Sequence, residues 1–175
     1  MALRSISACF TVALIASFTL IASGQAASSL PEGWESPTNA DLAGPNLELR
    51  ANKPGRYLVA EGDFDGDGVS DRAEILVNRI SRTYAVYAFI STASAPIELI
   101  DGRIHNVGRV GISVTDSGRI RTACGKGYDA SDPECKRGVP FVDTPFQSIE
   151  YFGFESGASQ FYWTGEAFTR ISTSD

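Results

Sequence analysis

The stretch that most constrains the fold is residues 63–74, which read DFDGDGVSDRAE. Carboxylates stand at positions 1, 3, 5, 9 and 12 of this run, and a glycine stands at position 6. Ca²⁺ takes roughly six to eight oxygen ligands, and alternate carboxylates on a tightly turning backbone can converge on one such ion. The glycine permits the sharp turn that this convergence needs. The run fits the pattern D-x-[DN]-x-[DN]-G-x5-E and therefore predicts a calcium loop.

The predicted ligands are four aspartates, one backbone carbonyl and one glutamate whose assignment stays open. They are Asp63, Asp65, Asp67, the carbonyl of Val69, Asp71 and Glu74. The alternative is a solvated acidic turn, but four aspartates within nine residues repel each other unless a cation lies between them.

The flanks of the loop predict strands rather than the helices of an EF-hand. Residues 53–62 read KPGRYLVAEG, a short apolar run bounded by proline and glycine, which is typical of a strand. After the loop, the apolar residues Ala73, Ile75 and Val77 alternate with other side chains, which favours a second strand. We therefore expect a strand–loop–strand calcium site.

Residues 62–73, GDFDGDGVSDRA, resemble the calcium loop of FG-GAP/VCBS-type repeats, which commonly read G-D-F-N-G-D-G-x-x-D-x-A. The resemblance covers residues 57–78. It implies that Asp63, Asp65, Asp67 and Asp71 bind Ca²⁺, and it leaves Glu74 outside the ligand set. FG-GAP motifs usually repeat around a propeller, but this chain carries one copy, so a repeat-built propeller is not expected.

Residues 1–27 have the composition of a secretory signal peptide. Arg4 precedes an apolar run, and small residues end the segment, with cleavage predicted after Ala26 or Ala27. A membrane anchor is the alternative, but the apolar run contains serine and threonine and lacks a basic stop. The sequence thus predicts a periplasmic or secreted protein.

Cleavage would leave 175 − 27 = 148 residues, a length that suits one domain. The formal charge of −6 would become −7, because Arg4 is the only charged residue that is lost. An acidic chain without a basic cluster argues against nucleic acid and anionic membranes as partners.

Cys124 and Cys135 remain after cleavage and are predicted to form a disulfide. A zinc site fits less well, because two thiols and the single His105 are too few ligands, and redox pairs usually read C-x-x-C. The closed loop and its flank carry Lys126, Tyr128 and Arg137. We expect these three residues to contact a partner, since tyrosine and arginine are common interface anchors.

The rest of the chain predicts an all-β fold. Residues 28–56, rich in proline and glycine, are expected to form a loosely ordered N-terminal arm, and residues 57–175 the calcium-binding β-domain. Short runs rich in aromatic and β-branched residues alternate with turns, which predicts an antiparallel β-sandwich or a barrel-like meander. The expected strands include 82–90, 97–100, 111–115, 119–122, 149–154, 160–163 and 167–171, with a turn at 101–102. A turn at 116–118 is expected to pair 111–115 with 119–122.

No catalytic motif accompanies the calcium loop. The chain lacks G-x-S-x-G, C-x-x-C, Walker and H-E-x-x-H sequences, and a Ser-His-Asp site would have to use His105. The clustered carboxylates suit calcium better than the paired acids of a glycan hydrolase. We therefore expect a non-catalytic binding module that takes a protein or glycan partner outside the cytoplasm.

Two alternatives stay open. Residues 122–128, TACGKGY, and the C-terminal RISTSD are similar to segments of small periplasmic proteins of proteobacteria. Some exported calcium-loop β-proteins of related appearance are lysozyme inhibitors or immunity proteins, which implies an inhibitor of a lysozyme-like cell-wall hydrolase. The predicted mature charge would favour encounter with a basic target. A glycan hydrolase is the second alternative.

Overall fold

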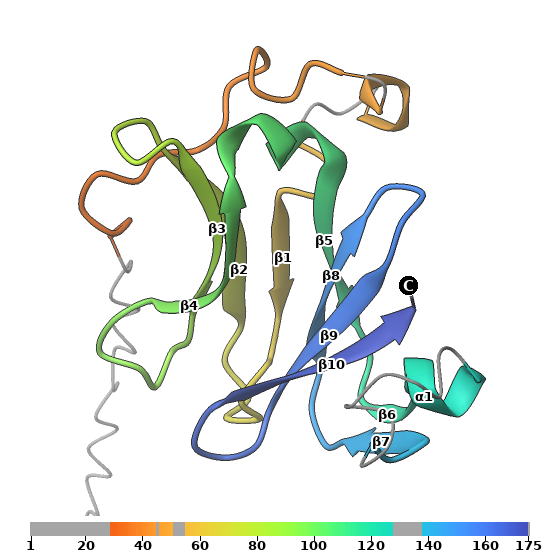
Figure 1. The fold of residues 1–175 in the computed structure, drawn as a ribbon. Helices are drawn as coiled ribbons and strands as arrows, with labels where there is room; N and C mark the ends of the chain where they lie inside the picture. The colour runs from red at the N-terminus through yellow and green to blue at the C-terminus, as the bar shows by residue number, and fades with distance from the viewer. Residues whose placement is uncertain (1–28, 45, 51–54, 128–137, 175) are drawn as a thin grey trace, which may run out of the picture.

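The computed structural model describes residues 29–44, 46–50, 55–127 and 138–174 (Figure 1). The predicted signal peptide lies outside these residues, as do Tyr128, Cys135 and Arg137. The described chain is built mainly of antiparallel strands, so the predicted all-β class is confirmed. Among its helices, none has the length and apolar character needed to span a bilayer.

Two four-stranded antiparallel sheets make up the body of the domain (Figure 1). The first sheet has the order β1-β2-β3-β4, formed by Val59–Gly62, Asp71–Asn78, Thr83–Phe89 and Ile97–Arg103. The second has the order β10-β9-β8-β5, formed by Phe168–Ser174, Ala158–Trp163, Ser148–Gly153 and Val110–Thr115. A separate two-stranded sheet pairs β6 (Gly118–Arg121) with β7 (Phe141–Thr144). The helical elements are η1 (Leu47–Arg50), η2 (Ile104–Arg109) and α1 (Ala123–Lys126).

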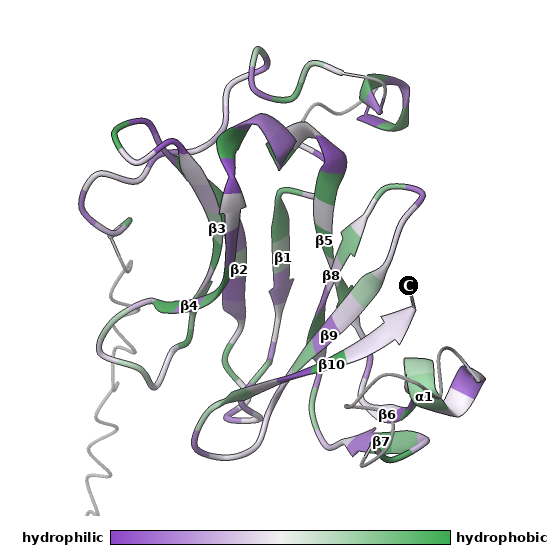
Figure 2. Cartoon of the chain, viewed as in Figure 1, coloured by the Kyte–Doolittle hydropathy of each residue, from purple (hydrophilic) through white to green (hydrophobic). Residues whose placement is uncertain are grey.

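The two large sheets meet along β1 and β5. Near this seam the backbone N–H of Ile112 donates to the carbonyl of Tyr57 over 2.9 Å. On the opposite side β4 and β10 are the outer strands and do not pair with each other, so the domain is a sandwich and not a closed barrel. Figure 2 shows hydrophobic and hydrophilic residues interspersed along the strands. The central strands β2 and β3 are buried along almost their whole length, because apolar clusters cover both faces of the first sheet.

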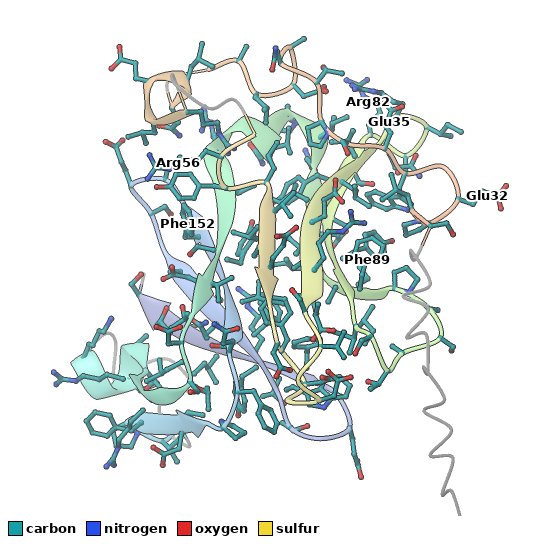
Figure 3. The ribbon with its side chains drawn as sticks, turned by 180° about the vertical axis from the view of Figure 1, so that it is seen from behind. Glu32, Glu35, Arg56, Arg82, Phe89 and Phe152 are labelled. Atoms are coloured by element: carbon teal, nitrogen blue, oxygen red, sulfur yellow. The ribbon has the colours of Figure 1, made fainter. Side chains whose placement is uncertain are left out.

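The segment before η1 packs on the outer face of the first sheet. Trp34 contacts Tyr87 edge to face, with ring centroids 5.1 Å apart, and Phe89 belongs to the same apolar cluster (Figure 3). The backbones of Glu35 and Val77 exchange two hydrogen bonds, of 3.0 and 2.8 Å. Leu42, only 2% exposed, belongs instead to the main core cluster. The described part of the predicted loose arm is therefore packed on the domain, because it supplies apolar side chains that cover an apolar face.

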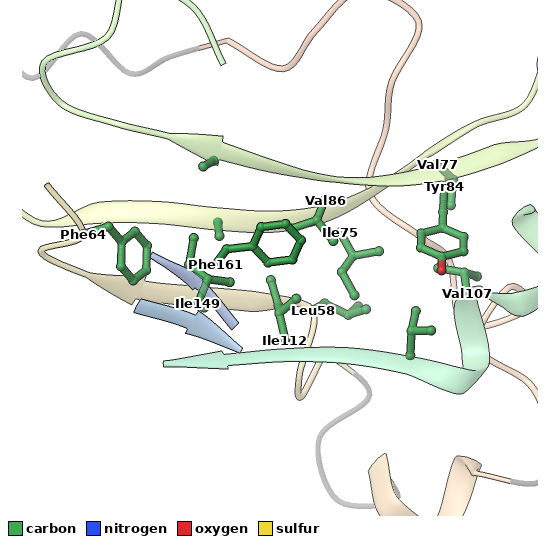
Figure 4. Packing of buried hydrophobic residues seen from close by; sticks show 14 of the residues in the cluster. Leu58, Phe64, Ile75, Val77, Tyr84, Val86, Val107, Ile112, Ile149 and Phe161 are labelled. Atoms are coloured by element: carbon green, nitrogen blue, oxygen red, sulfur yellow. The ribbon is translucent and has the colours of Figure 1, made fainter. Parts of the chain in front are cut away.

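The main core lies between the two sheets (Figure 4). Side chains of both sheets and of the loops meet there, including Ile75, Val86, Ile112, Ile149 and Phe161. Each fully buried side chain of this size contributes roughly 1.5–3 kcal/mol relative to an exposed one. This core holds the β1–β2 connection and its acidic loop in place.

Two local predictions were wrong. The strand β5 pairs with β8, and β6 pairs with β7, so the stretches 111–115 and 119–122 do not form a hairpin with each other. Asp101 and Gly102 do not form a turn but continue β4, where Gly102 pairs with Tyr84. A Cβ atom at Gly102 would lie 2.5 Å from the Tyr84 ring, so this glycine makes room for an aromatic side chain.

Candidate metal centre

The acidic loop connects β1 to β2, and Gly62 and Asp71 are the last paired residues on either side of it. This is the predicted strand–loop–strand arrangement. Phe64 points from the loop into the core and is fully buried. Its backbone N–H donates to Oδ2 of Asp71 over 2.9 Å, which ties the start of the loop to its end. The aspartates on either side are thus fixed by a buried anchor.

Three of the predicted ligands converge in the structure. Carboxylate oxygens of Asp63, Asp65 and Asp71 lie within 4.8 Å of one another. The side chains of Asp63 and Asp65 are half-buried, and Asp71 is 3% exposed. Such a group of oxygen atoms could hold a metal ion.

The remaining predicted ligands lie outside this three-carboxylate group. The carboxylate of Asp67 is exposed and accepts hydrogen bonds from the N–H of Val69, over 2.7 Å, and from the hydroxyl of Ser91, over 2.6 Å. Val69 is 37% exposed.

Glu74 lies within β2, beyond the end of the acidic loop. Its carboxylate accepts a hydrogen bond from the hydroxyl of Ser36 over 2.8 Å and lies 3.5 Å from the guanidinium of Arg72. These two contacts engage the carboxylate away from the three aspartates, in keeping with its open assignment.

Backbone N–H groups of the loop orient its carboxylates. Asp63 accepts from the N–H of Gly66 over 2.7 Å and from that of Gly68 over 3.0 Å, and Asp65 accepts from the N–H of Asp67 over 3.2 Å. Short side-chain-to-backbone bonds of this kind are how aspartates stabilise turns. They fold the loop around its own acidic groups.

Two glycines let the loop turn. Gly66 has φ of +82° and Gly68 has φ of +83°, values that favour glycine. A Cβ atom at Gly66 would also lie 2.1 Å from the ring of Phe146, whereas a Cβ atom at Gly68 would meet nothing within 4 Å. Gly66 is therefore required by conformation and by space, and Gly68 by conformation alone.

Ser91 and Thr92, in the connection between β3 and β4, complete the site, and the sequence pattern did not indicate them. The N–H of Ser91 donates to Oδ1 of Asp71 over 2.7 Å, and the hydroxyl of Thr92 donates to Oδ2 of Asp65. On the other side, Gln147 accepts from the N–H of Asp63 over 3.0 Å. These partners are distant in sequence, and the only sequence signal is a Ser-Thr pair directly after a buried strand.

Burial and hydrogen bonding act on the aspartates in opposite directions. Burial raises the pKa of Asp71, although hydrogen bonds from the N–H groups of Ser91 and Phe64 oppose this effect. The hydroxyl of Ser91 lowers the pKa of Asp67, and the N–H of Val69 acts in the same sense. A cation among the three carboxylates would offset the cost of keeping Asp71 charged in a buried position.

The segment predicted to contact a partner is described only in part. Cys124, in α1, is disulfide-bonded, and the predicted partner Cys135 lies outside the described residues. Lys126 donates from Nζ to the carbonyl of Thr173 over 2.8 Å, which ties α1 to β10. His105 is exposed on η2 and forms no side-chain hydrogen bond within the described part of the chain.

Comparison of the chain with protein-family models, with curated proteins and with solved structures found no significant match. Function is therefore inferred from the residues and their geometry. The group of Asp63, Asp65 and Asp71 is the candidate centre that the fold positions most firmly.

Proposed function

We propose that this chain is an exported calcium-binding β-sandwich protein that acts as a non-catalytic binding module. The observation that carries the metal part is the convergence of Asp63, Asp65 and Asp71 within 4.8 Å at the tip of the β1–β2 connection. Export is proposed from the signal-like composition of residues 1–27.

The donor atoms favour Ca²⁺ over other common ions. All of them are oxygens, whereas zinc sites usually include cysteine or histidine. Ca²⁺ accepts a flexible shell of oxygen ligands, whereas Mg²⁺ demands a near-ideal octahedron and keeps several waters. Asp67 and the carbonyl of Val69 follow in the same loop and would add to the three converging carboxylates, as the calcium-loop pattern requires.

The ion acts on the stability of the fold in this proposal. A ligand that binds only the folded chain stabilises it by RT ln(1 + [L]/Kd), which is about 2.7 kcal/mol at a hundred times Kd. Because the loop is anchored by the buried Phe64 and by contacts to Ser91, Thr92 and Gln147, this stabilisation extends to the β3–β4 and β7–β8 connections.

Calorimetric titration of the chelator-treated protein with CaCl₂ and with MgCl₂ tests the metal site. We expect one Ca²⁺ to bind, with Mg²⁺ weaker, and Asp65→Asn to abolish the heat of calcium binding. Glu166→Gln is the matched control, because Glu166 is exposed in the β9–β10 connection, outside the three-carboxylate group. No calcium heat in the unsubstituted protein, with no metal retained by mass spectrometry, would contradict the proposal.

The binding-module part needs a different measurement. Immobilised mature protein is exposed to a periplasmic extract and to purified peptidoglycan, and a muramidase assay is run in parallel. Retention of a partner without breakdown of peptidoglycan supports the proposal. Inhibition of the muramidase selects the inhibitor alternative, and release of peptidoglycan fragments by the protein alone selects the glycan hydrolase.

A further inference from the structure

A polar cleft of about 370 Å³ opens beside the main core, to which its lining residues Tyr84 and Val110 belong. Both large sheets contribute to its lining, which comes from β3, η2, β5, β8, β9, β10 and the β8–β9 connection. Its volume falls at the small end of the roughly 300–1,000 Å³ that is typical of ligand sites. The cleft suits a small ligand better than a long polymer chain.

A pair of tyrosines joins the two sheets at this cleft. The hydroxyl oxygens of Tyr84, in β3, and Tyr151, in β8, lie 2.6 Å apart. One hydroxyl donates to the other, so the second O–H hydrogen has no acceptor in the described part of the chain. Burial, with the hydrogen bond to Tyr151, raises the pKa of Tyr84. The pair therefore offers one free donor.

Four further lining side chains have unused hydrogen-bonding capacity. The amide of Asn106 and the hydroxyls of Ser156, Ser172 and Ser174 form no hydrogen bonds within the described residues. Each of these groups can both donate and accept, which matches the hydroxyls of a sugar. An apolar ligand would instead remove them from water without replacing their hydrogen bonds.

Arg170 provides the one formal charge among the described lining residues. Its Nε donates to Oγ of Ser159 over 3.1 Å, and its guanidinium carbon lies 6.0 Å from the ring centre of Phe161. The two terminal nitrogens form no hydrogen bond or ion pair within the described residues and so remain available to a ligand. A guanidinium presented in this way favours a carboxylate, which it can bind through two parallel hydrogen bonds.

We infer that this cleft binds a sugar that carries a carboxylate group. Arg170 takes the carboxylate, and the tyrosine pair with the asparagine and serine side chains takes the ring hydroxyls. The inference rests on the binding-module function proposed above and names its ligand class, but it does not depend on the metal. Within a chain of net charge −6, the described lining of the cleft is locally positive and so complements an acidic ligand.

The test is an NMR titration of calcium-saturated, ¹⁵N-labelled protein with D-glucuronate, D-glucose and sodium sulfate. We expect glucuronate to shift the signals of the Asn106 side-chain amide and the Gly157 and Ser172 backbone amides. Glucose, which lacks the carboxylate, should bind at least about tenfold more weakly, because hydrogen bonds to charged groups contribute roughly 1.5–3 kcal/mol. Sulfate offers the charge without the sugar ring and should bind more weakly than glucuronate.

Substitutions separate the binding of the carboxylate by Arg170 from the binding of the ring hydroxyls. Arg170→Gln should weaken glucuronate by at least about tenfold and leave glucose unchanged, since only the charge-assisted bonds are lost. Tyr151→Phe should weaken both sugars. Arg119→Gln is the matched control, because Arg119 is an exposed arginine on β6, outside the cleft.

Each of three other outcomes of these titrations would reject one part of the proposals. Sulfate that binds as tightly as glucuronate at the same signals rejects the sugar and leaves only an anion site. Unchanged signals with all three probes reject the inference, while calcium heat in the same sample leaves the metal proposal standing. Glucuronate binding by protein that gives no calcium heat and retains no metal in mass spectrometry rejects the metal site and keeps the cleft.

Discussion

Carboxylates cluster at two places in the molecule, at the turn that joins β2 to β3 and in the acidic loop, and only those at the turn are paired with an arginine. Beside the turn, Arg79 donates from both terminal nitrogens to Asp41, over 2.7 Å each, and from Nε to Glu35 over 2.6 Å. In the loop, Asp63, Asp65 and Asp71 converge within 4.8 Å, and none of them forms an ion pair within the described residues. The carboxylates beside the turn have a counter-ion within the protein, whereas the three aspartates of the loop could hold a metal ion instead.

Arg50 shows the opposite case to the acidic loop. It is a buried cation that has no carboxylate partner in the described chain. It is 1% exposed and donates to the carbonyls of Arg56 and Val110, and its guanidinium lies 4.9 Å from the ring centre of Phe154. Burial lowers the pKa of Arg50. Carbonyl dipoles and a ring face thus hold a charge that no side-chain anion among the described residues balances.

Of the substitutions that test this contrast, replacing Arg50 should change the free energy of unfolding most. Arg50→Met leaves the carbonyls of Arg56 and Val110 without their donor, and we expect a loss of roughly 3 kcal/mol in the free energy of unfolding. Urea unfolding followed by tryptophan fluorescence measures it. The matched control is Arg56→Met, because Arg56 is exposed and stacks on Tyr57. Equal losses in the two variants would show that the buried contacts of Arg50 add nothing.

The effect of Asp65→Asn on thermal stability should depend on calcium, with no loss in chelator and a loss in the presence of calcium. In excess chelator the substitution removes one of three mutually repelling charges, so the melting temperature should stay level or rise. At a calcium concentration of a hundred times Kd it should forfeit about 2.7 kcal/mol of stabilisation. Thermal melts with EGTA and with CaCl₂ give both values. A variant that is equally destabilised in both buffers would assign Asp65 a purely structural role.

The two loop glycines offer a finer contrast. Gly66→Ala meets both an unfavourable φ and the Phe146 ring, and should destabilise the fold by roughly 2 kcal/mol. Gly68→Ala meets the φ alone and should cost about 1 kcal/mol. Chemical unfolding of the chelator-treated variants isolates the backbone effect from metal binding. The reverse order would mean that Phe146 moves aside freely.

The smallest expected effect is the loss, at low pH, of the stabilisation that the Asp41–Arg79 ion pair gives to the fold. Hydrogen bonds from Arg79 lower the pKa of Asp41 from 3.8 in the folded state. A carboxyl with a depressed folded pKa stabilises the fold above its unfolded pKa, and this contribution is lost as the pH falls through the folded value. Fluorescence of Trp34, read in a Trp163→Phe background, should therefore shift toward that of exposed tryptophan as the pH falls below about 4. Asp41→Asn should show the shift already at neutral pH.

The spacing of aspartates and glycines in the sequence predicted those residues of the site that lie within the acidic loop. Alternate aspartates with a turn glycine bring Asp63 and Asp65 together, and the paired strands bring in Asp71. The same reasoning could not find Ser91 or Thr92, because their position depends on how β3 lies against the loop. The direction of Glu74 depends likewise on the segment that carries Ser36.

The fold was predictable to a similar extent. Strand locations follow from residue type, and the β9–β10 hairpin, where Phe168 pairs with Trp163, agrees with the expected runs at 160–163 and 167–171. The partner of β5 was not predictable from adjacency, because the chain makes a detour through β6, α1 and β7 before returning as β8. A lone tryptophan in the N-terminal segment suggests that Trp34 holds this segment to the domain, but its partner Tyr87 is a long-range contact that the local sequence does not reveal.

The link from Lys126 to the carbonyl of Thr173 also covers part of an open edge of the second sheet. A free strand edge can recruit strands from other molecules and start aggregation. On the edge strand β10, Lys126 occupies one such carbonyl, and the pairing with β9 is irregular between Ser172 and Ser174. The other edge, β4, exposes the charges of Glu98, Asp101 and Arg103. The two outer edges of the sandwich therefore both carry features that disfavour the addition of a further strand.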